Sequence, residues 1–215
     1  MDDQPVETTL YSLNDAAPEP PQRRTEERYL SLLRVGTLLI GERRELCLIR
    51  NISAGGMMIR AYTEIEPDTP VTVELKHGEP VTGKSMWAKD GLVGVHFDEP
   101  IDVVELLAPA GDGPRPRMPR IEVSCTAFVR EGAHFRRTKT LNISQGGIGV
   151  ESPAELTIDS EVIISLLGMS PIQGVVRWRD ANSYGISFNR IMALSDLVAW
   201  IQAQQGQERR RAAAG

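Results

Sequence analysis

The chain contains the same sequence pattern twice. Residues 51–97 match residues 142–188 at a constant offset of 91 and without a gap. Because a period near 90 residues is too long for a solenoid unit, each copy is expected to be a whole domain. Identical pairs include Asn51/Asn142, Ile52/Ile143, Ser53/Ser144, Gly55/Gly146, Gly56/Gly147, Gly83/Gly174, Trp87/Trp178, Gly94/Gly185 and Phe97/Phe188.

Within each copy the local pattern is that of short β-strands. Residues 71–76 and 161–167 alternate between apolar and polar or run apolar, and they are rich in β-branched side chains. Residues 81–97 and 172–188 each have the pattern of two strands around a polar turn. Several short strands separated by turns predict an all-β fold, with one small antiparallel barrel in each copy.

Helix is predicted in two places. The longer helix is expected at 193–203, near the carboxyl end, where Ser195 or a neighbour could cap its start. A shorter equivalent at 101–107 would close the first copy. The apolar face of the longer helix consists of Leu194, Leu197, Val198 and Ile201.

Two domains and three connecting or terminal segments are predicted. The amino-terminal segment carries five acidic residues, no basic residue and little hydrophobic patterning, which is typical of disorder. The predicted segments are a disordered acidic tail at 1–21, a first domain at 22–107, an Ala/Gly/Pro-rich linker at 108–116, a second domain at 117–204 and a flexible tail at 205–215.

The composition argues against several classes of function. The formal net charge is −5, and aromatic residues make up 5% of the chain with no interleaving of basic and aromatic residues along a strand, so no nucleic-acid partner is expected. The amino terminus lacks the basic and apolar regions of a secretory signal. No apolar run approaches the about 20 residues that span a bilayer. We therefore expect a cytoplasmic protein without membrane insertion.

No catalytic or metal-binding pattern stands out. The three histidines are scattered, and neither an HExxH nor a CxxC spacing occurs, so we expect no metal site and no cofactor. No set of nucleophile, base and orienting residue indicates an enzyme. Cys47 and Cys125 lie in alternating apolar stretches and are expected to be buried structural thiols. Trp87 and Trp178 are expected to pack in the cores.

The first copy combines two polar features whose chemistry suits a nucleotide. One is an arginine segment at 23–28, in which Arg24 and Arg28 are four residues apart. Arginine pairs bidentately with phosphate and stacks on flat rings. The other is Asn51-x-Ser53-x-x-Gly56, whose short side chains can contact a base edge and whose glycine permits close approach. Together these features suit a ligand with more than one phosphate and a flat base.

Arg24-x-x-x-Arg28 followed by Asn51-x-Ser53-x-x-Gly56 resembles the motif of the PilZ family, the bacterial receptors for cyclic di-GMP. The resemblance covers about residues 23–107 and again about 114–203. It implies two tandem six-stranded antiparallel β-barrels, each closed by a short helix, with the longer helix at the carboxyl terminus. It also implies that the ligand is cyclic di-GMP, which would bind Arg23, Arg24, Arg28, Asn51, Ser53, Gly55 and Gly56 and act by ordering the loop and rearranging the domains.

The second copy departs from this motif in its arginine segment. A constant offset places Pro119 opposite Arg28, whereas one inserted residue places Arg120 there, and both alignments remain open. Three prolines stiffen the segment. A second, weaker site would consist of Arg115, Arg117, Arg120, Asn142, Ser144 and Gly147.

An alternative function remains open beside the receptor. Some PilZ-like domains lack the arginines, so the chain could be a ligand-independent adaptor for protein interaction. Arg24 and Arg28 favour the receptor over the adaptor. In either case a downstream protein partner is expected, and the sequence does not identify it.

Overall fold

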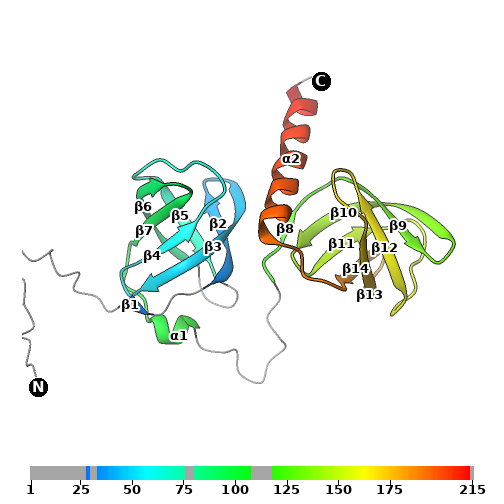
Figure 1. Cartoon of the computed structure of the whole chain (residues 1–215), viewed down its shortest axis with the longest axis horizontal. Helices are drawn as coiled ribbons and strands as arrows, with labels where there is room; N and C mark the ends of the chain where they lie inside the picture. Colours follow the sequence, from blue (N-terminus) through cyan, green and yellow to red (C-terminus); the bar gives the residue numbers. More distant parts are fainter. Residues whose placement is uncertain (1–27, 30–32, 76–79, 108–117, 214–215) are drawn as a thin grey trace, which may run out of the picture.

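Two closed antiparallel β-barrels make up most of the chain (Figure 1). The computed structural model describes residues 28–29, 33–75, 80–107 and 118–213. The elements of barrel one are β1 (Arg28–Tyr29), β2 (Arg34–Ile40), β3 (Arg43–Ser53), β4 (Gly56–Arg60), β5 (Pro70–Glu74), β6 (Val81–Lys89), β7 (Leu92–Phe97) and α1 (Val103–Leu107). Those of barrel two are β8 (Ile121–Glu122), β9 (Thr126–Glu131), β10 (His134–Ser144), β11 (Gly147–Glu151), β12 (Glu161–Leu166), β13 (Ile172–Asp180), β14 (Ser183–Phe188) and α2 (Leu194–Ala213).

The two barrels share one topology. In barrel one the strand order is β3-β2-β5-β6-β7-β4, and β4 pairs back with β3 to close the sheet. In barrel two the order is β10-β9-β12-β13-β14-β11, and β11 pairs back with β10. A short extra strand, β1 or β8, pairs with β3 or β10. The predicted pair of six-stranded antiparallel barrels is confirmed.

Alternating apolar side chains fill the inside of each barrel. Ile49, Ile59 and Val73 are fully buried in barrel one, and Ile143 and Ile164 are fully buried in barrel two. Each such side chain contributes about 1.5–3 kcal/mol relative to an exposed one. Each barrel therefore has a hydrophobic core of its own, as expected for two copies of one domain.

A β-bulge interrupts the alternation at the same place in both copies. The pairing of β3 with β4 shifts between Ile49 and Asn51, and the pairing of β10 with β11 shifts between Thr140 and Asn142. Before the bulge in β3, the odd-numbered Ile49 is buried; after it, the even-numbered Ile52 is. One extra residue reverses which face each side chain occupies.

A second bulge corrects the prediction made for the tryptophans. The pairing of β6 with β7 shifts between Ser85 and Trp87, and Trp87 is 42% exposed instead of lying in the core. Its ring covers the backbone of Gly94, where an added Cβ would lie 2.2 Å from the indole Nε1. Trp178 is half-buried and covers Gly185 in the same way. The bulge turns both rings to the outside of their barrels.

The carboxyl-terminal helix is longer than predicted. It continues to Ala213, through most of the segment expected to be a flexible tail, because its Gln, Glu, Arg and Ala residues are strong helix formers. Ser195 lies inside the helix and does not precede it. The predicted apolar residues Leu197, Val198 and Ile201 are buried. Among the described residues, no helix is long and apolar enough to cross a bilayer.

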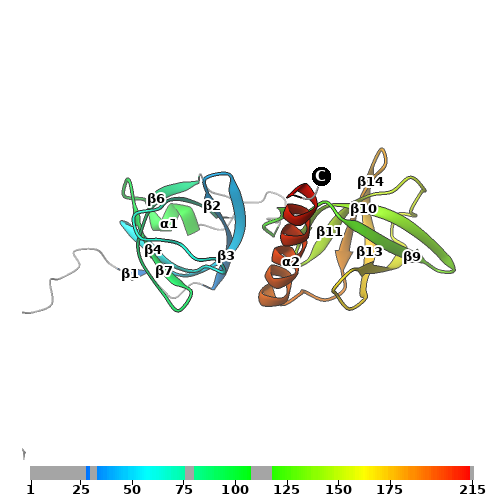
Figure 2. The same ribbon diagram turned by 90° about the horizontal axis from the view of Figure 1, so that it is seen from above.

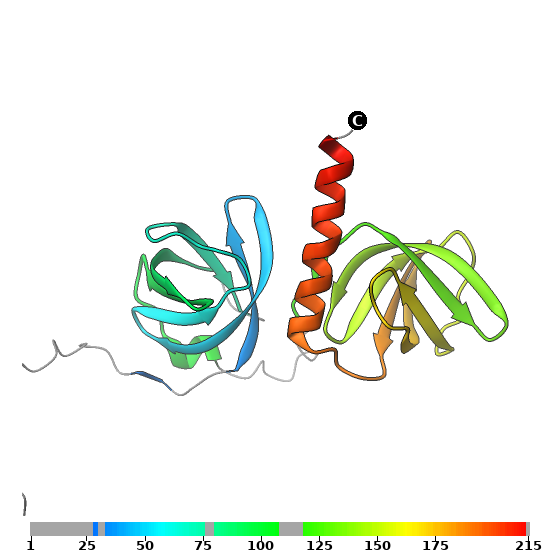
Figure 3. The same cartoon turned by 45° about the horizontal axis from the view of Figure 1, so that its top comes forward.

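Helix α2 lies between the two barrels in all three views (Figures 1, 2 and 3). Leu46 of β3 is only 3% exposed and belongs to the same apolar cluster as the core of barrel two. Val35 and Tyr62 of barrel one pack against that cluster. Gln202 of α2 donates a hydrogen bond from Nε2 to the carbonyl of Tyr62 at 2.8 Å. These contacts form the junction between the barrels.

Candidate functional site

The predicted motif of barrel one lies at the end of β3 and in the turn to β4. Because the bulge reverses the strand face, Asn51 and Ser53 are half-buried on the outer surface while Ile52 points into the core. The hydroxyl of Ser53 donates a hydrogen bond to the carbonyl of Gly56 at 3.2 Å. An added Cβ at Gly56 would lie 2.5 Å from the carbonyl oxygen of Val95, so only glycine fits there.

The arginine segment of barrel one reaches this motif through its last residue. Arg28 of β1 pairs with Ser53 of β3 in the antiparallel register, and Tyr29 pairs with Ile52. The backbone of Arg28 is therefore next to the Asn-x-Ser strand. Arg23 and Arg24 lie outside the described residues. Gly55 lies in the turn, and its carbonyl accepts a hydrogen bond from the Phe97 amide at 3.0 Å.

The register of barrel two decides between the two alignments of the arginine segments. Ile121 pairs with Ile143 as Tyr29 pairs with Ile52, so Arg120 corresponds to Arg28. The alignment with one inserted residue is therefore correct, and the constant offset is wrong for this segment. Arg115 and Arg117 lie outside the described residues.

In barrel two the arginine contacts the motif directly. Arg120 donates a hydrogen bond from Nη1 to Oδ1 of Asn142 at 3.1 Å. The amide of Asn142 lies over Gly149, where an added Cβ would be 3.0 Å from Oδ1; barrel one has Met58 at the paired position. The contact shows that a guanidinium at this position of the fold can reach the motif asparagine.

The turn of barrel two repeats the geometry of barrel one but is more covered. The hydroxyl of Ser144 donates to the carbonyl of Gly147 at 3.2 Å, and Ser144 is 3% exposed, whereas Ser53 is half-buried. The sulfur of Met118 would lie 3.0 Å from an added Cβ at Gly146. The turn of barrel two is thus more covered by side chains than the turn of barrel one.

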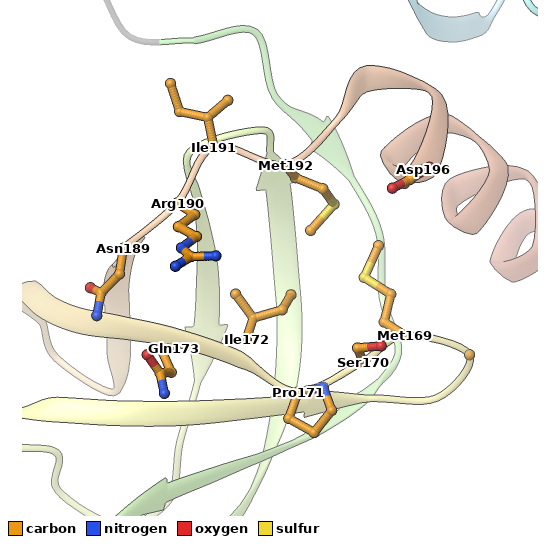
Figure 4. Close-up of a pocket in the computed structure, with 11 residues that line it drawn as sticks. Met169, Ser170, Pro171, Ile172, Gln173, Asn189, Arg190, Ile191, Met192 and Asp196 are labelled. Carbon is orange, nitrogen blue, oxygen red and sulfur yellow. The ribbon is translucent and has the colours of Figure 1, made fainter.

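A cavity of about 690 Å³ lies at the α2 end of barrel two (Figure 4). Its wall comes from the β12–β13 connection at 168–171, the first two residues of β13, the β14–α2 connection at 189–192, and Asp196. Met169, Ile172 and Met192 supply apolar surface there. None of its residues belongs to the predicted sites. The sequence contained no local signal for it, because the two connections meet only in the folded chain.

The cysteines do not form a reactive site. Cys47 is fully buried, and burial raises the pKa of its thiol to about 12, although a backbone hydrogen bond involving Gly36 acts in the opposite direction. Cys125 is half-buried, contrary to the prediction of full burial, and its sulfur lies 3.3 Å from the hydroxyl of Thr140. Burial also raises the pKa of Cys125. Within the described residues, no three His, Cys, Asp or Glu side chains form a group that could hold a metal ion.

Solved structures that resemble this chain do so at low identity. The Borreliella burgdorferi PlzA protein in complex with c-di-GMP is 16% identical, with a TM-score of 0.35, over 78% of this chain and 86% of that chain. The Bacillus subtilis inhibitor of motility (MotI/DgrA) is 18% identical, with a TM-score of 0.32, over 84% and 99%. YcgR from Escherichia coli in complex with c-di-GMP is 13% identical, with a TM-score of 0.29, over 85% and 86%.

The family assignment rests on the sequence. No curated protein sequence matches the chain. The family model of the PilZ domain matches it twice, over residues 22–108 and 114–203. These two regions include both barrels and both Asn-x-Ser-x-x-Gly turns, and together they span most of the chain. The chain therefore belongs to the PilZ domain family.

Proposed function

We propose that the chain is a receptor for cyclic di-GMP and that the ligand binds to barrel one at the motif end of β3. Arg23, Arg24 and Arg28 would pair with the phosphates and stack on guanine. Asn51 and Ser53 would contact the guanine edge, and Gly55 and Gly56 would let it approach the backbone. Membership of the PilZ family supports the ligand class.

The observation that carries this proposal is the pairing of Arg28 with Ser53. It brings the end of the arginine segment beside Asn51 and Ser53, which the bulge has turned to the outer surface. The backbone of Arg28 therefore lies next to the strand that carries Asn51 and Ser53, which supports a ligand that contacts all three residues.

Barrel one is the better site of the two. In barrel two, Arg120 already donates to Asn142, Ser144 is covered, and Met118 lies close to Gly146. A ligand there would first have to break a hydrogen bond and move a side chain. The position four residues before Arg120 is Pro116, so the Arg-x-x-x-Arg spacing is also lost.

Strand β3 provides a route from the ligand to the arrangement of the barrels. It carries Asn51 and Ser53 at one end, and it also carries Leu46, which is buried in the junction with α2 and barrel two. A ligand that holds residues 23–28 against this strand could bind two arrangements of the barrels with different affinities. The difference between these affinities would shift the equilibrium from one arrangement to the other. A downstream protein partner would then distinguish the two arrangements.

Titration calorimetry of the full chain with cyclic di-GMP tests the receptor proposal. We expect a Kd of roughly micromolar, about −8 kcal/mol, weakening as salt is added because Arg–phosphate pairs contribute. Absence of binding at about 100-fold higher concentration would favour the ligand-independent adaptor.

Hydrogen exchange with and without ligand tests the proposed route through β3. Protection of residues 20–30 alone would confine the effect of the ligand to the arginine loop. Protection of residues 106–120 as well would extend the effect to the junction.

A further inference from the structure

The outer face of β9 and β10 in barrel two combines aromatic and basic side chains. Phe128 lies opposite Arg137 in the antiparallel register, and Arg130 lies opposite Phe135. Lys139 follows on the same face, because side chains two residues apart share one side of a strand. Each ring thus has a cation across the strand and another two residues along its own strand. We call these five residues the β9–β10 patch.

The patch corrects the expectation that no strand interleaves basic and aromatic residues. Phe-x-Arg on β9 and Phe-x-Arg-x-Lys on β10 do so on one surface. Ala127 and Val129, which flank Phe128 on β9, are fully buried. The interleaving becomes evident once the burial pattern shows that these side chains share the outer face.

Both aromatic rings are exposed, and one of them has a cation–π contact. Phe135 is 73% exposed and Phe128 is 48% exposed, which leaves two large apolar rings in water. The guanidinium of Arg130 lies over the ring of Phe135, 5.9 Å from its centre. This cation–π contact orients a ring that no core packing supports.

The cations of the patch are free to meet an anion. Among the described residues, no carboxylate forms an ion pair with Arg130, Arg137 or Lys139. The acidic neighbours are Glu151, opposite Lys139 on β11, and Glu161 at the start of β12. A hollow of about 400 Å³ adjoins the patch, and its lining includes Arg137 and Lys139 as well as the carboxylate of Glu151.

The corresponding face of barrel one is used as a contact surface. The constant offset places Leu46 at the position of Arg137, and Leu46 is buried in the junction. In barrel two, Arg137 at this position is exposed. Equivalent faces of the two barrels therefore differ: the face of barrel one is apolar and buried at Leu46, whereas the face of barrel two is aromatic, basic and exposed.

We propose that the β9–β10 patch binds single-stranded nucleic acid, with bases stacked on Phe128 and Phe135 and phosphates paired with Arg130, Arg137 and Lys139. Alternating rings and cations on a strand surface suit an unpaired strand, whose bases and phosphates both need partners. An acidic peptide would pair with the cations but has no base to stack on the rings. The net charge of −5 describes the whole chain and does not decide the charge of one face.

Fluorescence anisotropy tests this proposal with labelled oligo(dT) and oligo(U) of about 16 nucleotides, the upper end of the range that one small barrel covers. The full chain is used without cyclic di-GMP. Phe135→Ala is expected to weaken binding by about 5- to 150-fold, the effect of losing one stacked base. The double variant Arg137→Gln/Lys139→Gln is expected to weaken binding and flatten its dependence on salt.

Matched controls lie on barrel one. Met86→Ala removes an exposed apolar side chain, and Lys84→Gln/Lys89→Gln removes two exposed cations; neither should change the affinity for the oligonucleotides. Thermal unfolding of Phe135→Ala checks that the variant folds, and this side chain is exposed enough to be replaced without loss of the core.

Four outcomes would overturn the proposal. The first is no binding of either oligonucleotide at low salt. The second is binding that Phe135→Ala leaves unchanged, which would mean general attraction to polyanions. The third is equal or tighter binding of a duplex of the same length. The fourth is binding of vesicles containing anionic lipid without binding of oligonucleotides, which would identify a membrane surface instead.

Discussion

Arg28 and Arg120 occupy the same position of the fold but have different surroundings. Arg120 donates to Asn142, whose amide lies over Gly149, while barrel one has Met58 at the paired position. Arg120 already has a partner within its own barrel, so a ligand at barrel two would have to replace this contact. The two copies share Asn-x-Ser-x-x-Gly but differ in their arginine segments, which is why barrel one stays the proposed site.

Replacing these two arginines should affect ligand binding unequally. Arg28→Ala is expected to weaken cyclic di-GMP binding by about 1.5–3 kcal/mol, the loss of a hydrogen bond to a charged group. Arg120→Ala is expected to change the affinity by less, because it removes a contact within the protein. Titration calorimetry of both variants measures the difference. Equal losses would show that barrel two contributes as much as barrel one.

The buried thiol of Cys47 should be unreactive in the folded protein and should make stability depend on alkaline pH. Because burial raises the pKa of Cys47 to about 12, its thiol should resist a thiol reagent until the chain unfolds. The raised pKa favours the folded state fully below the unfolded value of 9.0, and this contribution is lost as the pH rises toward 12. The free energy of unfolding should fall by up to about 1.4 kcal/mol per pH unit in that window.

Cys47→Ala provides the control for this pH dependence. The variant should show a smaller loss of stability between these pH values, since it lacks the buried thiol. Denaturant unfolding at several alkaline pH values measures the slope. Identical slopes for the variant and the unaltered protein would contradict the role assigned to Cys47.

At the scale of secondary-structure elements, bulges and glycines shape the motif strands. The bulge in β3 turns Asn51 and Ser53 outward, and Gly56 lets β4 pass close to β7. At Gly56 an added Cβ would meet a backbone carbonyl, which cannot move as a flexible side chain can. The position of the motif therefore depends on backbone geometry as much as on the motif side chains.

Two glycine-to-alanine changes should have opposite effects on stability. Gly56→Ala places a methyl group 2.5 Å from the Val95 carbonyl oxygen and is expected to cost about 1–3 kcal/mol. Gly206→Ala in α2 meets no atom within 4 Å and is expected to stabilise the helix by about 0.5–1 kcal/mol. Chemical denaturation of both variants gives the two free energies. A Gly56→Ala variant as stable as the original would show that the strands can separate without cost.

At the scale of the whole molecule, α2 and Leu46 join the barrels into one structure. The helix packs on barrel two through Leu197 and Trp200, and it contacts barrel one through Gln202. Burial raises the pKa of Glu45 on β3, and the charges of Arg43 on the same strand and of Arg209 on α2 act in the opposite direction. The junction therefore combines apolar burial with polar contacts.

Replacing Leu46 should loosen this junction without emptying the core of barrel one. Leu46→Ala is expected to separate thermal unfolding into two transitions, because the side chain belongs to the apolar cluster of barrel two. Leu39→Ala is the matched control, since Leu39 is half-buried on the same sheet and belongs to neither core cluster. Calorimetry measures both variants. A single transition shifted equally in the two variants would contradict the role of Leu46 as a connecting residue.

The sequence by itself determined the number of domains, their class and the place of the motif. The repeat established two copies, the alternation of apolar residues established strands, and the order of Arg28, Asn51 and Ser53 located the expected site. The inference of the fold is confirmed, because strand alternation is a local property of the chain. The ligand site stays a prediction.

Only the tertiary structure decided which way several of these side chains face and what covers them. The bulges in β3 and β6 shift the alternation by one residue. This shift turned Asn51 outward, and it turned Trp87 outward against the prediction. The pairing of Ile121 with Ile143 aligned Arg120 with Arg28. The physical reason is that a bulge, a register and a buried face are set by the partner strand or neighbouring element, which lies far away in the sequence.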